Sequence, residues 1–86
     1  MMAELQGERG EHGNQEALLR TVLRVDPYRE RSYRALMTLL AAQGRRAEAL
    51  VLYKQLDGLL RTRFGASAAP QTQVLAVRIG QAQPLP

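Results

Sequence analysis

The chain has 86 residues and no cysteine, so it is long enough for one small domain and holds neither disulfides nor thiolate zinc sites. No apolar run approaches the roughly 18 residues of a membrane span, and the polar N-terminus is unlike a secretory signal. The formal net charge is +4. We therefore expect a cytoplasmic protein that has no membrane partner.

The charge is unevenly distributed along the chain. Residues 1–14 carry Glu4, Glu8 and Glu11 against Arg9, a balance of −2, which leaves +6 for the remainder. All of the 12 basic residues except Lys54 are arginines. A basic surface suits an acidic protein partner or nucleic acid. A GC-rich genome, which encodes arginine in place of lysine, would produce the same composition.

Residues 1–13 contain three glycines, several charges and few large apolar side chains, which indicates a disordered polar leader. Asn14 suits the N-cap of a first helix. The Asp26-Pro27 step ends that helix, because the residue before a proline is pushed out of the α region. Between these points the apolar residues recur at helical spacing: Leu18, Leu19, Val22, Leu23 and Val25.

Two further helices are expected on either side of Gly44, which suits the left-handed position at a helix end. The first begins just after Pro27, and its apolar face is Tyr33, Leu36, Met37 and Leu40. The second covers about 46–63, with Gly58 marking either a close approach of another backbone or a slight bend. Its main stripe is Ala49, Tyr53, Leu56, Leu60 and Phe64, widened by Leu50, Leu52 and Leu59.

A last helix is expected from Pro70, which fits a first helical position, to Gly80. Its apolar side is Val74, Leu75, Ala76 and Ile79. Residues 81–86 then form a flexible tail. The sequence thus predicts an all-α domain of about four helices over residues 14–80, with no strand. Short loops make successive helices antiparallel neighbours.

Small residues flank the tight turn at Gly44, where two helices come closest. Ala41, Ala47 and Ala49 would allow this approach. Such packing is typical of a helix-turn-helix repeat, and the chain resembles the tetratricopeptide repeat (TPR). The positions that match its pattern, and that we expect to form a TPR-like core, are Tyr33, Leu36, Met37, Leu40, Gly44, Ala49, Tyr53 and Leu56.

A narrower resemblance lies in the order of several short motifs. Asp26-Pro27 comes first, GRRAEAL spans 44–50, and Phe64-Gly65 is followed by PQTQVL from Pro70. Over roughly residues 16–79, the chain resembles the C-terminal half of the bacterial transcriptional activator domain. That TPR-like domain follows a winged-helix DNA-binding domain in SARP-type antibiotic regulators. The resemblance implies a non-enzymatic protein–protein interaction module connected with transcription regulation.

The chain departs from this family pattern in three places. We expect the polar leader to stand in place of the family's first helices, and the 86 residues show no winged-helix pattern. Ala69 stands where the family tends to place a capping serine, which weakens the start of the last helix. A complete chain would be a stand-alone version of the interaction half. A truncated regulator fragment is the other interpretation.

The sequence contains no set of residues with the pattern of a catalytic site. His12 is the only histidine and lies in the leader. Glu30 and Arg34, at i and i+4, are expected to form a helix-stabilising pair. The carboxylates of the helical part show no metal-binding spacing: Glu16, Asp26, Glu30, Glu48 and Asp57. The sequence therefore predicts no enzyme activity, no cofactor and no metal.

One hairpin cannot cover every apolar residue of the first helix. We expect a second copy, in a homodimer, or another protein to cover the rest. Arg45 and Arg46 are either partner contacts or merely polar residues of an exposed turn. The expected interaction surface is Leu18, Val22, Val25, Arg20, Arg24, Arg45 and Arg46.

The alternative is a small nucleic-acid-binding protein that uses its arginine-rich helical surface. In the interaction-module hypothesis, DNA is reached only indirectly through a partner, or weakly through basic residues.

Overall fold

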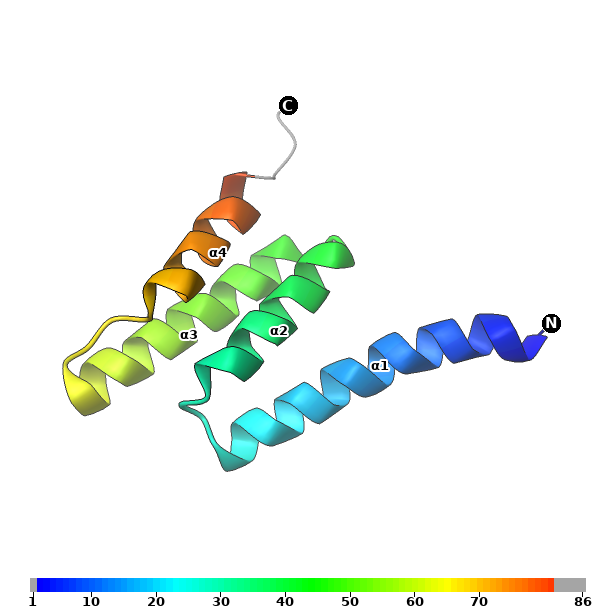
Figure 1. Cartoon of the computed structure of the whole chain (residues 1–86), viewed down its shortest axis with the longest axis horizontal. Coiled ribbons are helices and arrows are strands. Elements are labelled where there is room, and N and C mark those ends of the chain that lie inside the picture. The colour runs from blue at the N-terminus through cyan, green and yellow to red at the C-terminus, as the bar shows by residue number, and fades with distance from the viewer. Residues whose placement is uncertain (1, 82–86) are drawn as a thin grey trace.

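Figure 1 shows the computed structural model, which describes the backbone of residues 2–81 and the side chains of residues 13–81. Four helices follow one another: α1 (Met2–Val25), α2 (Glu30–Ala42), α3 (Arg46–Phe64) and α4 (Pro70–Gln81). Residues 2–81 contain no strand, so the expected all-α fold of four helices is confirmed. The expected tail falls, apart from Gln81, outside the described residues. None of the described helices is long and apolar enough to cross a membrane.

The first helix differs most from expectation. α1 begins at Met2 and not at Asn14, so the segment interpreted as a polar leader is helical in the structure. Figure 1 shows this N-terminal half of α1 extending away from the other three helices. The segment contains no proline, and a glycine inside a helix costs only about 1 kcal/mol relative to alanine. The segment has three such glycines, so its local helix propensity is low, and its mobility stays a prediction for hydrogen exchange.

The centre of the molecule is the antiparallel hairpin of α2 and α3. α2 contributes Tyr33, Leu36, Met37 and Leu40 to the buried core, and α3 contributes Ala49, Leu52, Leu56 and Leu60. These sets follow the i, i+3, i+4 and i+7 positions that place side chains on one helix face. Tyr53 is half-buried and packs against this core.

The turn between α2 and α3 is closed by Gly44, whose φ of 79° lies in the left-handed region. The Arg45 N–H donates to the Leu40 carbonyl at 2.8 Å and the Gly44 N–H donates to Ala41 at 3.0 Å, a Schellman arrangement. Directly beyond this turn, Ala49 is fully buried. The expectation for Ala47 was wrong, since this residue is exposed. Residues two positions apart in a helix point about 200° away from each other, so Ala47 and Ala49 cannot both face α2.

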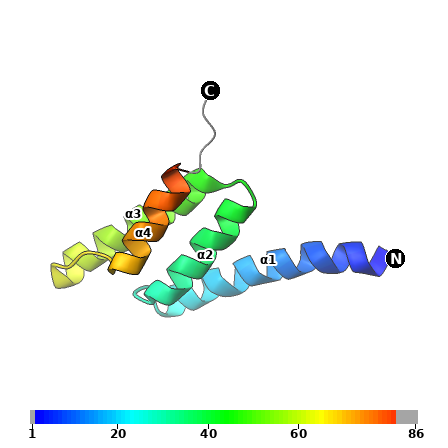
Figure 2. The same cartoon turned by 45° about the horizontal axis from the view of Figure 1, so that its top comes forward.

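The outer helices flank this hairpin, and Figure 2 shows α2 between α1 and the α3–α4 pair. α4 packs against both α3 and α2, whereas α1 packs against α2. α4 buries Thr72, Ala76 and Ile79. Among the described residues of α1, none is fully buried.

Three details of α3 and α4 depart from the sequence interpretation. A Cβ at Gly58 would meet nothing within 4 Å, so this glycine marks no close backbone approach. Phe64 is 63% exposed, and its ring packs edge-on against Tyr28 at 5.3 Å between centroids. Val74 was expected on the apolar side of α4 but is 52% exposed. The inner face of α4 is instead completed by the threonine at 72, which is fully buried.

Candidate interaction surfaces

An apolar stripe runs along the outer side of α1. Leu18 is 64% exposed and Val25 is 82% exposed, with the half-buried Val22 between them. Their i, i+4 and i+7 spacing places all three on one side of the helix. Leu19 and Leu23 point the other way and pack against the core. We call Leu18, Val22 and Val25 the outer stripe of α1.

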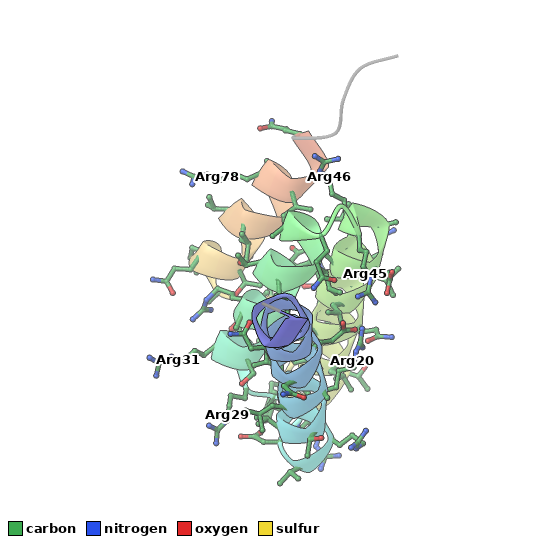
Figure 3. All side chains as sticks on the ribbon, turned by 90° about the vertical axis from the view of Figure 1, so that its right-hand side faces the viewer. Arg20, Arg29, Arg31, Arg45, Arg46 and Arg78 are labelled. Atoms are coloured by element: carbon green, nitrogen blue, oxygen red, sulfur yellow. The ribbon has the colours of Figure 1, made fainter. Side chains whose placement is uncertain are left out.

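The arginines of the molecule divide between two sides. Figure 3 shows Arg20 and Arg45 on one side of the structure, and Arg31 and Arg78 projecting from the opposite side. Arg20 and Arg45 form ion pairs. Among the described side chains, Arg31 and Arg78 take part in no ion pair. The charges of Arg20 and Arg45 are thus partly neutralised within the chain, whereas Arg31 and Arg78 have no such ion pair among the described side chains.

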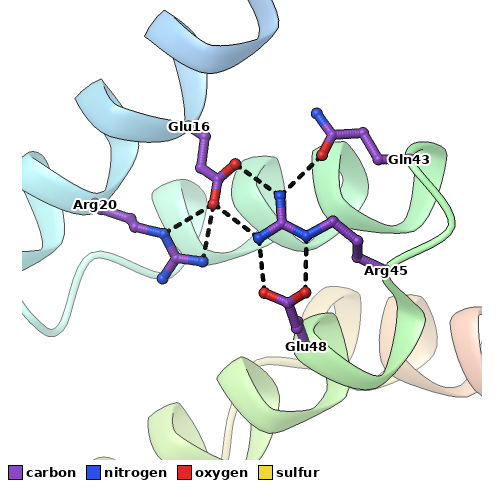
Figure 4. Close-up of polar contacts among 5 residues, drawn as sticks. All are labelled: Glu16, Arg20, Gln43, Arg45 and Glu48. Atoms are coloured by element: carbon purple, nitrogen blue, oxygen red, sulfur yellow. Dashed lines mark hydrogen bonds and ion pairs between the residues drawn. The ribbon is translucent and has the colours of Figure 1, made fainter.

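Arg45 is the centre of a charged network between α1 and the α2–α3 turn (Figure 4). Its Nη1 donates to Glu16 Oε1 at 2.8 Å, and its Nη2 donates to Glu16 Oε2 at 3.1 Å. Its Nε and Nη2 donate to the two carboxylate oxygens of Glu48 at 2.8 and 2.7 Å. Arg20 Nε donates to Glu16 Oε2 at 3.1 Å, and Arg45 Nη1 also donates to the side-chain oxygen Oε1 of Gln43 at 3.0 Å. Such bidentate pairs fix geometry as well as charge.

The network sets the electrostatics of its members. Hydrogen bonds from Arg45 hold the pKa of both Glu16 and Glu48 below the usual glutamate range. The same bonds raise the pKa of Arg45. Of the four arginines expected on the interaction surface, Arg20 and Arg45 are thus engaged within the chain. Arg24 is exposed and donates to the Thr21 hydroxyl at 3.1 Å, while Arg46 is half-buried.

A second polar tie, which the sequence did not reveal, holds α4. The Glu30 carboxylate of α2 accepts the Ala69 N–H at 2.9 and 3.1 Å and the Thr72 hydroxyl at 3.1 Å. It therefore caps α4 from another helix, where the family's capping serine is replaced by alanine. Arg34 donates to the Thr72 hydroxyl at 2.9 Å. Glu30 and Arg34 meet through this hydroxyl, and the direct ion pair expected between them is not formed.

A groove of about 470 Å³ lies between α2 and α4. We call it the α2–α4 groove. Arg34 and Arg78 line it, together with Ala35, Val74 and Leu75, and with the polar Thr38 and Gln71. No carboxylate lines it. Successive lining residues are one or three positions apart on each helix, a spacing that was readable in the sequence. Their facing across two helices was not, because it depends on how α4 docks.

The carboxylates of the described side chains serve structural contacts. Besides the network at Arg45 and the cap by Glu30, Asp26 pairs with Arg29 at 3.3 Å and Asp57 pairs with Arg61 at 2.8 Å. Within the described part of the chain, no three His, Cys, Asp or Glu side chains gather into a possible metal site. The side chain of His12 lies outside the described residues.

Antiparallel helical hairpins packed side by side are the architecture of α-helical repeat proteins. The chain belongs to the family of the bacterial transcriptional activator domain, whose model matches residues 1–79. The resemblance read from the sequence is therefore confirmed. The match extends it over the N-terminal half of α1, which the sequence interpretation had set aside as a leader.

A solved structure of Mycobacterium tuberculosis EmbR in complex with a low affinity phosphopeptide is similar to this chain. The TM-score is 0.79 and the sequence identity is 28%. The match covers 98% of this chain and 22% of the EmbR chain, so this chain spans less than a quarter of that regulator's length. No curated protein matches the chain.

Proposed function

We propose that this chain is a non-enzymatic protein–protein interaction module of bacterial transcription regulation, and that it associates through the outer stripe of α1. Its membership of a regulatory domain family supports the regulatory role. The observation that carries the proposal is the exposure of Leu18 and Val25, at 64% and 82%, on a helix that has no fully buried described residue. A role in transcription would place the chain in the cytoplasm.

The physical argument concerns the open edge of a repeat. Repeat units bury their apolar faces by stacking on neighbours, and roughly three units are needed for a stable array. The described helices amount to about one and a half hairpin units and one further helix. Burying a leucine or valine fully contributes about 1.5–3 kcal/mol, so covering the outer stripe is a substantial gain. A second copy in a two-fold arrangement would cover it and leave no new open edge.

Sedimentation equilibrium at micromolar concentration tests this proposal. We expect the wild-type chain to form a dimer and a Leu18→Gln, Val25→Gln double variant to be monomeric. The matched control is Val51→Gln, because Val51 is 53% exposed on α3 and lies outside the outer stripe. A wild-type monomer that unfolds cooperatively would contradict self-association. Unchanged association of the double variant would exclude the outer stripe as its interface.

Nucleic-acid binding is the competing function. Arg20 and Arg45, two of the arginines expected to carry it, are paired with Glu16, which reduces their attraction for phosphate. We therefore expect at most weak retention on DNA. Affinity for DNA that falls steeply with salt, with a slope near −0.9 per phosphate contact over several contacts, would favour the competing function.

A further inference from the structure

The α2–α4 groove combines positive charge with an apolar floor. Arg34 and Arg78 line it from facing helices, and Val74 and Leu75 lie between them on α4. Val74 is 52% exposed, so this floor is open to solvent. Thr38 adds a hydroxyl group that can bond to a peptide backbone. The groove therefore offers both charged and apolar contacts within a space of about 470 Å³.

No direct ion pair neutralises the positive charge of the groove among the described side chains, and only Glu30, one hydroxyl away from Arg34, offsets it in part. Arg78 is exposed and takes part in no ion pair there, and Figure 3 shows its side chain projecting from the same side as Arg31. Arg34 donates to a neutral hydroxyl, that of Thr72. The nearest carboxylate in this network is Glu30, and both its oxygens are occupied by the start of α4. By contrast, the arginine at 45 is bonded to two carboxylates.

We propose that the α2–α4 groove binds an acidic segment of a partner protein. Carboxylates of that segment pair with Arg78 and Arg34, and an apolar side chain beside them packs on Val74, Leu75 and Ala35. Charge complementarity indicates that the partner segment is acidic, because the exposed Arg78 and the half-buried Arg34 line a groove that has no carboxylate in its lining, and such a groove attracts anions. This surface adds to the interaction role proposed above and lies on helices other than α1.

A protein segment fits the groove better than a nucleic acid does. Nucleic-acid backbones are bound by rows of cations that neutralise successive phosphates. Here only two arginines line the groove, and its other contacts include three apolar side chains. Aromatic side chains that stack on bases are also absent from the lining. A peptide with alternating acidic and apolar residues uses both kinds of contact.

Fluorescence anisotropy tests the proposal with a short fluorescein-labelled peptide of glutamate and leucine. We expect saturable binding that weakens when glutamine replaces glutamate in the peptide. Arg78→Gln should weaken binding about 5-fold, the effect of an exposed ion pair worth about 1 kcal/mol. Val74→Asp, which adds a negative charge to the floor, should weaken it about 10-fold.

Val51→Asp is the matched control, because Val51 is 53% exposed on α3, against 52% for Val74 on α4, and does not line the groove. Binding by this variant should equal that of the wild type. Equal losses in both valine variants, or equal binding of the glutamine peptide, would overturn the proposal. Circular dichroism establishes that each variant is folded.

Two competitors distinguish other occupants. The first competitor is a peptide of residues 1–13, which carries Glu4, Glu8 and Glu11. If this peptide binds the groove and the glutamate–leucine peptide does not, the occupant is a second copy of this chain. A DNA duplex that binds in an Arg78-dependent way, while the glutamate peptide does not, would make the groove a nucleic-acid site. Either result would overturn the proposal. Sedimentation reports on α1 and anisotropy on the groove, so each of the two proposals can fail alone.

Discussion

The two outer helices, α1 and α4, rest on the same hairpin but are attached to it differently. α4 buries Thr72, Ala76 and Ile79, which are 0%, 7% and 5% exposed. α1 is attached by the half-buried Leu19 and Leu23. The polar ties differ in the same way. A carboxylate caps α4 through a backbone N–H and a buried hydroxyl, whereas α1 is tied by an ion pair whose arginine is 34% exposed.

This difference separates a fixed surface from an adaptable one. Buried apolar contacts and satisfied buried hydrogen bonds keep α4 in place, so the α2–α4 groove is formed before any partner arrives. Exposed ion pairs contribute little and are weakened by salt. α1 is therefore the helix that is least stably attached, and its outer stripe is the apolar surface most in need of cover.

The largest expected effect comes from disturbing the α2–α3 hairpin, against which both outer helices pack. Ala49 is fully buried between α2 and α3, so Ala49→Leu should overpack the hairpin and lower the free energy of unfolding by about 1–3 kcal/mol. Ala47→Leu, two residues away and exposed, should change it by less than about 0.5 kcal/mol. Urea unfolding of both variants checks this. Equal midpoints for the two would contradict the assigned packing of the hairpin.

A smaller effect is expected from removing the cap of α4. Glu30→Ala leaves the Ala69 N–H and the Thr72 hydroxyl without their acceptor, so the free energy of unfolding should fall by about 1–2 kcal/mol. Asp57→Ala is the control, because it removes an i, i+4 ion pair of α3 worth about 0.3–0.5 kcal/mol. Equal losses for the two variants in urea unfolding would show that Glu30 does not cap α4 and acts only as an exposed charge.

The smallest effect is expected at the ion pair of α1. Glu16→Gln should lower the free energy of unfolding by about 0.2–1 kcal/mol at low salt, and by less at high salt, because the pair is partly exposed. Lys54→Gln is a control for the loss of one charge, because Lys54 is exposed on α3 and forms no ion pair among the described side chains. A loss for Glu16→Gln that is independent of salt would show that the tie is not electrostatic.

The same network predicts a pH dependence. Hydrogen bonds from Arg45 lower the pKa of Glu16 and Glu48 in the folded chain relative to the unfolded chain. Their stabilising contribution is therefore complete above the unfolded pKa and is lost as the pH falls through the lower pKa of the folded chain. Wild type should lose more stability than Glu16→Gln over this range. Parallel acid titrations of thermal stability for the two proteins would contradict the prediction.

Periodicity was enough to predict α2, α3 and α4, because local patterns determine them, whereas the family was recognised from the resemblance of several short motifs. Tyr33, Leu36 and Leu40 fall at helical spacing, and Gly44 and Pro70 mark a helix end and a helix start. The start of α1 was not predictable in this way. Glycines and charges in residues 2–13 resemble a leader, and no apolar stripe opposes that interpretation.

The contacts that join distant parts of the chain could not be predicted from the sequence. Arg45 meets Glu16 across 29 residues, and Glu30 meets Thr72 across 42. Both depend on the angle at which an outer helix docks, which no local pattern encodes. For the same reason Val74 was expected to be buried. The helical period shows which residues share a face, but not which face the neighbour covers.

Hydrogen exchange of backbone amides, compared between α1 and α4 in dilute protein, tests the central difference most directly. We expect the amides of residues 18–25 to exchange faster than those of residues 74–79, since opening α1 breaks fewer buried contacts. Raising the salt from about 0.05 to about 1 M should widen this gap by speeding exchange in α1 alone. Equal protection of the two helices, or faster exchange in α4, would contradict the account.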